Sequence, residues 1–254
     1  MNFGFAGERY TPALQWLADG LGEQLRRHGY VPVDPASEDV RLVLNFTRAD
    51  RPEPHRRRSQ ATFVVSVIQV PERPDDILRA AYPLLVQSLS NLLIYLVGDE
   101  EAVRETYFVT LERGYYPLTV APGDDAYFAR IYDRLAPLAS SRLVIRNEFV
   151  PDLAPELWKG DEITGQLRWA SRELEELDLL PAPFPIQEIL SERDFRHVQH
   201  LYGIGGLSYG NLSARHGPRS YWMSASGVNK ARLETIGRDI LLVTGYDPEK
   251  NAMI

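Results

Sequence analysis

The sequence contains no cysteine among its 254 residues. Thiolate catalysis, disulfide bonds and zinc sites with cysteine ligands are therefore excluded, and the composition fits a reducing compartment. The N-terminus lacks a basic segment followed by an apolar one, so we expect no signal peptide. The most apolar stretch, 82–97, contains polar residues and is shorter than the roughly 20 residues that span a bilayer. These absences predict a cytoplasmic protein with no membrane partner.

Positive charge is not in excess either, because the formal net charge is −7. We therefore expect no nucleic acid partner, although a local pocket of opposite potential can still take a small anionic substrate. The chain is 44% hydrophobic and 25% charged, which is typical of a globular protein. Its length suits one large domain or two ordinary ones.

The first part of the chain alternates between strand-like and helix-like segments. Runs rich in valine, isoleucine and phenylalanine predict strands at 40–46, 61–70 and 106–111. Apolar residues at helical spacing, or at high density, predict helices over 11–27, 75–96 and 124–138. This alternation predicts an α/β domain over residues 1–145, with Rossmann-like layers, a largely parallel sheet and an unknown function.

Capping residues set the expected ends of these helices. Thr11 and Pro12 suit the N-cap and the first turn of the first helix, which His28 and Gly29 should close. In the second helix Pro83 should mark a kink or a new start. Asp124 or Asp125 is placed to cap the third helix.

The character of the sequence changes after residue 145. We expect a helical connector over 146–185, which contains an amphipathic helix from Glu162 to Leu180 and ends in a proline-rich segment. A third region, 186–254, starts with a helix near Ser191 that stops at a glycine cluster, 203–206. A hairpin with its turn at 216–219 follows, and then a strand at 239–244.

Two small-residue turns flank this predicted hairpin. Glycines expose backbone N–H groups there, and asparagine and serine add donors without bulk, so an anion pocket is one interpretation. A pair of ordinary turns between strands is the other, and the spacing alone leaves both open.

The residues themselves carry a resemblance. The segment Gly210-Asn211-Leu212-Ser213-Ala214-Arg215, followed by Ser224-Ala225-Ser226-Gly227, resembles the opening of the class II aldolase/adducin family. That family has a Gly-Asn-(Leu/Val)-Ser-x-Arg strand before a Thr-Pro-Ser-Gly-type turn, in which this chain has Ser224-Ala225 for Thr-Pro. The resemblance covers about residues 186–254 and implies part of an α/β/α domain with a mostly antiparallel sheet.

The resemblance also implies a chemistry. Family aldolases hold a substrate phosphate with positions that correspond to Gly210, Asn211, Ser226 and Gly227. A complete member uses zinc or another divalent metal on three histidines, with an acidic proton-transfer residue, as a lyase, epimerase or dehydratase of small sugar-phosphate-like carbonyl compounds. The His-x-His segment is missing here, so we expect a fragment that binds no metal and is inactive alone, with unknown catalytic residues. The alternative is a non-catalytic, adducin-like interaction protein.

Other motifs favour simpler interpretations. His197 and His200 share a face of a predicted helix, but no third ligand accompanies them, so a solvated face is expected. The basic run Arg56-Arg57-Arg58 suits an exposed loop. The turn at 4–8 lacks the spacing of a nucleotide-binding loop. Unpaired strand edges in a partial domain would favour association, which allows a homo-oligomer.

Overall fold

The structure is a computed structural model that describes residues 1–59, 61–111, 113–141, 146–177, 185, 188, 191–192, 195–196, 211–225, 228 and 230–254. Contacts divide the chain into two compact units. The first comprises Met1–Ser141 with Pro181–Asp194, and the second comprises Arg142–Leu180 with Phe195–Ile254. None of the described helices is both long and apolar enough to cross a membrane.

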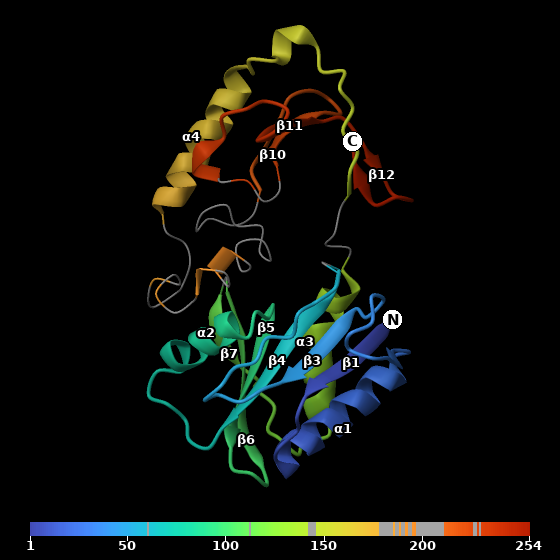
Figure 1. The fold of residues 1–254 in the computed structure, drawn as a ribbon, viewed down its shortest axis with the longest axis vertical. Coiled ribbons are helices and arrows are strands. Elements are labelled where there is room, and N and C mark those ends of the chain that lie inside the picture. Colours follow the sequence, from blue (N-terminus) through green and yellow to red (C-terminus); the bar gives the residue numbers. More distant parts are fainter. Residues whose placement is uncertain are drawn as a thin grey trace. The chain divides into compact units, whose positions relative to one another are not determined.

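A seven-stranded sheet forms the centre of the first unit (Figure 1). Its strand order is β2-β1-β3-β4-β5-β6-β7, in which the pairings from β2 to β5 are parallel and the last two are antiparallel. The predicted α/β class with a largely parallel sheet is therefore confirmed. The strands are β1 (Asn2–Gly7), β2 (Val31–Pro32), β3 (Leu42–Phe46), β4 (Phe63–Val70), β5 (Leu92–Gly98), β6 (Val103–Thr110) and β7 (Gly114–Pro117).

Three helices accompany this sheet: α1 (Pro12–Arg27), α2 (Ile77–Gln87) and α3 (Tyr127–Ser140). Helices α1 and α3 pack against each other and share one apolar core with alternate residues of the central strands. Helix α2 contacts β5, β6 and β7. A sheet that is packed on both faces explains why its inner strands read as continuous apolar runs.

The ends of α1 agree with the capping prediction. Thr11 is the N-cap, and its Oγ1 accepts the Leu14 N–H at 3.2 Å. At the other end His28 is the C-cap, and Gly29 follows with a φ of 78°. That left-handed conformation is accessible to glycine at little cost.

Two predictions about the first unit are wrong in part. The apolar density of 75–96 predicts a helix, but α2 ends at Gln87 and β5 follows, with every residue of that strand buried. A segment that is buried on both faces has no periodicity by which sequence distinguishes helix from strand. The N-cap of α3 is Ala126, while the Asp124 carboxylate accepts the Ala126 N–H at 2.8 Å in the preceding turn.

The second unit is built from short elements. Helix α4 (Glu162–Glu176) packs on the short helix η3 (Lys230–Arg232) and on a three-stranded antiparallel sheet of β9 (Ser213–Arg215), β10 (Tyr221–Ser224) and β11 (Ile240–Val243). This sheet contains the predicted hairpin and the strand after it. The remaining elements are η1 (Pro155–Leu157), β8 (Arg146–Asn147), β12 (Tyr246–Asp247) and β13 (Ala252–Met253).

A small apolar cluster joins these elements. Leu167 of α4, Trp222 of β10, Leu233 and Ile240 are its buried members. The helix expected within a connector therefore shares its core with the hairpin. Most of the helix predicted near Ser191, and the whole glycine cluster at 203–206, lie outside the described residues.

Candidate functional site

The strand end that carries Asn211 lies beside the start of the next turn. The backbone N–H of Ser224 donates to the Leu212 carbonyl at 2.9 Å, and the Leu212 N–H donates to Ser224 Oγ at 3.0 Å. The same hydroxyl lies 3.5 Å from Oδ1 of Asn211. Ser224 thus links the exposed Asn211 to the turn that begins at Ala225. Gly210, Ser226 and Gly227, the other predicted anion-binding residues, lie outside the described residues.

A buried carboxylate fixes the far side of this turn. The Ala225 N–H donates to the Asp239 carbonyl at 2.8 Å, and the Asp239 carboxylate accepts the N–H groups of Glu234 and Thr235 at 3.0 and 2.8 Å. The Arg238 guanidinium bonded to Asp239, helped by these amides and opposed by burial, lowers the pKa of Asp239 to about 2. The carboxylate therefore stays ionised at physiological pH and holds the loop closed.

Lys230 lies on η3, a few residues after the turn. Its side chain is 1% exposed, and Nζ has no hydrogen-bond partner in the described part of the chain. Burial lowers the pKa of this lysine, because a buried ammonium loses its hydration. Its carbonyl accepts a hydrogen bond from Ser171 Oγ, which attaches η3 to α4. The second unit thus contains a buried amine with no counter-charge among these residues.

A second polar cluster joins α4 to the other end of the hairpin. Oδ2 of Asp161 accepts the indole N–H of Trp222 at 2.8 Å and lies 3.2 Å from Nδ1 of His216. Burial by itself raises the pKa of Asp161, but hydrogen bonds from the Thr164 N–H and Trp222, together with His216, outweigh it and lower the pKa. An imidazole with Nδ1 facing a carboxylate can exchange protons through Nε2.

Sequence reasoning missed this cluster. His216 stands in a predicted turn with no recognisable pattern, and Asp161 stands just before a predicted helix. Only the packing of α4 on the hairpin brings the two together. The available signal was the isolated acid before the helix, which is a capping pattern. Capping does occur, because Oδ1 of Asp161 accepts the Thr164 N–H at 2.9 Å.

The described residues do not supply the metal site that the resemblance implies. Among them, no three histidine, aspartate or glutamate side chains come together as possible ligands. His197 and His200 lie outside the described residues, and Nδ1 of His216 faces Asp161. What the described residues around Asn211 offer is hydrogen-bond donors.

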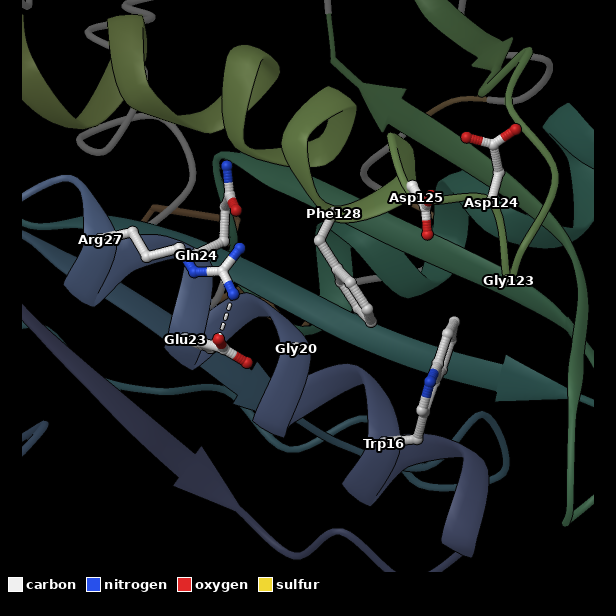
Figure 2. Close-up of a pocket in the computed structure, with 9 residues that line it drawn as sticks. All are labelled: Trp16, Gly20, Glu23, Gln24, Arg27, Gly123, Asp124, Asp125 and Phe128. Atoms are coloured by element: carbon white, nitrogen blue, oxygen red, sulfur yellow. Dashed lines mark hydrogen bonds and ion pairs between the residues drawn. The ribbon is translucent and has the colours of Figure 1, made fainter.

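The first unit has a cleft of about 260 Å³ between α1 and the segment that leads into α3 (Figure 2). Trp16, Gly20 and the ion-paired Glu23 and Arg27 line it from α1. Asp124, Asp125 and Phe128 line it from the opposite side, and the ring of Phe128 reaches toward Trp16. A Cβ on Gly20 would lie 2.1 Å from Cζ of Phe128, so only glycine admits that ring.

The two other first-unit motifs have structural roles. After the 4–8 turn, the Leu14 N–H is capped by Thr11 and the Ala13 N–H donates to the Glu100 carbonyl at 3.0 Å. These amides at the start of α1 are therefore already bonded. In the basic run, Arg57 donates to the carbonyls of Thr62 and Leu89, which anchors the loop between β3 and β4.

No family model, curated protein or solved structure matches this chain. A function therefore has to be argued from the residues and contacts within each unit. In the second unit these are the Asn211 strand end, the turn beside it and the buried Lys230; in the first they are the cleft between α1 and α3.

Proposed function

We propose that residues 186–254 form part of a class II aldolase/adducin-type domain, and that the loop at Asn211 holds the anionic group of a small carbonyl compound. The observation that carries this proposal is the bonding of Ser224 to both Leu212 and Asn211. Because of these bonds, the two segments that carry the family motif are adjacent in space.

The chemistry of these groups suits an anion. Asn211 uses Oδ1 toward Ser224, and its amide nitrogen has no partner among the described residues, which leaves two N–H donors for a ligand. A short turn of small residues adds backbone N–H groups without steric cost. Hydrogen bonds to a charged group contribute about 1.5–3 kcal/mol each, which is enough to hold a phosphate.

The proposed role of this chain stops at binding. Carbon–carbon bond cleavage in this family depends on a divalent metal that stabilises an enediolate. The described residues do not fit such a site, so no step of the proposal passes through a metal. An anionic carbonyl compound bound at Asn211 is the substrate class that the motif and the geometry jointly support.

For the first unit we propose a Rossmann-like, doubly wound arrangement. The strand order β2-β1-β3-β4-β5, parallel throughout, supports this interpretation. In such sheets the chain reverses direction between β1 and β3, and ligands commonly lie beyond the carboxyl ends of those strands. The bonded amides at the start of α1 favour side-chain recognition there over phosphate binding by a helix N-terminus.

The test is a titration of the isotope-labelled chain with inorganic phosphate and with dihydroxyacetone phosphate, followed by amide chemical shifts. We expect saturable shifts at Asn211, Leu212 and Ala225, and a loss of affinity of roughly tenfold or more in Asn211→Ala. Arg219→Gln is the control, because it removes an exposed charge at the far end of the hairpin. Equal affinity in Asn211→Ala, or shifts confined to arginines, would overturn the proposal.

A further inference from the structure

We propose that the cleft between α1 and residues 123–128 binds a small organic ammonium compound, which stacks on the ring of Trp16 and pairs with the carboxylates of Asp124 and Asp125. The site lies wholly within the first unit. It is independent of the function proposed for the second unit.

The three aromatic rings at the cleft leave one face of Trp16 open. Its ring centroid lies 5.4 Å from that of Tyr127 and 4.9 Å from that of Phe128, while the latter two are 5.3 Å apart. Rings stacked on opposite faces of an indole would lie roughly 10 Å apart, so Tyr127 and Phe128 share one side of it. Trp16 is 37% exposed, which agrees with an uncovered face.

The aromatic floor is held in place from beneath. Tyr127 is fully buried, and its hydroxyl shares a 2.7 Å hydrogen bond with Oγ1 of Thr106 on β6. Phe128 sits over Gly20, where no side chain competes with it. Trp16 therefore meets a preformed surface, and a ligand need not order these rings when it binds.

The charges around the cleft select a cation. Arg27 is the one cationic side chain of its lining, and it is already paired with Glu23 one turn away (Figure 2). One oxygen of Asp124 accepts the Ala126 N–H, which leaves the other for a ligand. Asp125 neither caps α3 nor makes a hydrogen bond or ion pair in the described structure. Two carboxylates thus remain available at the rim.

The size and polarity of the cleft narrow the ligand class. An aromatic face attracts a cation most strongly when that cation sheds its water easily, as quaternary and alkylated ammonium groups do. Metal ions keep their hydration shell and prefer oxygen ligands on several sides. A volume of about 260 Å³ accommodates a compact molecule of the size of choline. The geometry therefore points to an alkylated ammonium group on the open indole face.

The experiment compares choline with 3,3-dimethylbutan-1-ol, which has the same shape without the charge. Binding is followed through the indole N–H resonance of Trp16, assigned by its loss in Trp16→Leu. We expect saturable binding of choline, at least tenfold weaker binding of the neutral alcohol, and a several-fold weaker affinity for choline in Asp125→Asn. Trp16→Phe should retain part of the affinity, because it keeps an aromatic face.

Trp169→Leu is the matched control, since it removes a 61% exposed tryptophan from α4 and should leave choline binding unchanged. Equal affinity for choline and the neutral alcohol would overturn the proposal in favour of an apolar pocket. Absence of saturable choline binding would overturn it outright. Asp125→Asn changes only an exposed surface residue, so its result does not depend on whether Trp16→Leu folds.

Discussion

The two units are stabilised by different means. In the first, an apolar core fills the space between the sheet and its helices, and nearly all the buried apolar side chains of the described residues belong to it. In the second, four buried apolar residues form the core, and polar contacts at Asp161, Asp239 and Ser171 complete the packing. Short strands bury little apolar surface, so directional bonds must carry more of the stability.

The largest effect is expected in the core of the first unit. Phe108 on β6 is fully buried and stacks on Tyr116 at 5.4 Å, so Phe108→Ala should lower the free energy of unfolding by about 3–5 kcal/mol. Chemical denaturation, with hydrogen exchange read over residues 1–141, would measure it. Phe149→Ala, at a position 69% exposed, should change stability by less than about 0.5 kcal/mol. Similar costs for the two variants would contradict a well-packed core.

A smaller effect is expected when the second unit loses one donor. Trp222→Phe removes the indole N–H that bonds Asp161 and leaves a small void, which should cost about 1–3 kcal/mol. Hydrogen exchange at β9 and β10 would report the loss. Trp169→Phe is the control because its side chain is exposed. If both variants lose the same stability, the bond to Asp161 does not stabilise this unit.

A polar contact in the first unit tests the comparison from the other side. Thr11→Ala removes the N-cap of α1 and the 2.7 Å bond to Gln69, and it should cost about 1 kcal/mol. Thr11→Ser keeps the hydroxyl and should cost only a few tenths of that amount. Urea denaturation of the three proteins would measure both changes. A loss as large as that in Phe108→Ala would mean that the first unit also depends on directional bonds.

The smallest effect is expected to have the opposite sign. Lys230→Met replaces a buried, unpartnered amine with an apolar side chain of similar length, and it should raise the free energy of unfolding by about 0.5–1 kcal/mol at pH 7. Because folding lowers the pKa of Lys230, the unfolded chain binds more protons and the lysine penalty is present at pH 7. The penalty fades as the pH rises toward the ordinary pKa of lysine.

Denaturation at a series of pH values from neutral to about 10 would measure this difference. The advantage of Lys230→Met should shrink as the pH rises, whereas Lys159→Met, at an exposed position, should show neither the gain nor the trend. A variant that is less stable than the natural chain at every pH would indicate that Lys230 pairs with an anionic group.

Local features of the fold could be predicted from the sequence, and features that depend on tertiary contacts could not. Helix α1 was predictable because Thr11, Pro12 and Gly29 act within a few residues of its ends. Strand β5 was not, because its burial on both faces comes from neighbours distant in sequence. The parallel sheet follows from the alternation of elements, but its strand order does not.

The candidate sites divide in the same way. Asn211 could be proposed from its motif, since the motif residues lie close together in the sequence. The Asp161–His216 contact could not, because it arises only when α4 packs on the hairpin. The α1 side of the cleft was visible in principle, since Trp16, Gly20 and Arg27 recur at helical spacing. Nothing local indicated that Asp124 and Asp125 would face them.

The burial of Lys230 has a consequence for proteolysis. The chain contains only three lysines, and of these Lys159 and Lys250 are exposed. A protease that cuts after lysine can reach those two in the folded protein, but it can reach Lys230 only after η3 separates from α4. The rate of cleavage at Lys230 therefore measures how often the second unit opens.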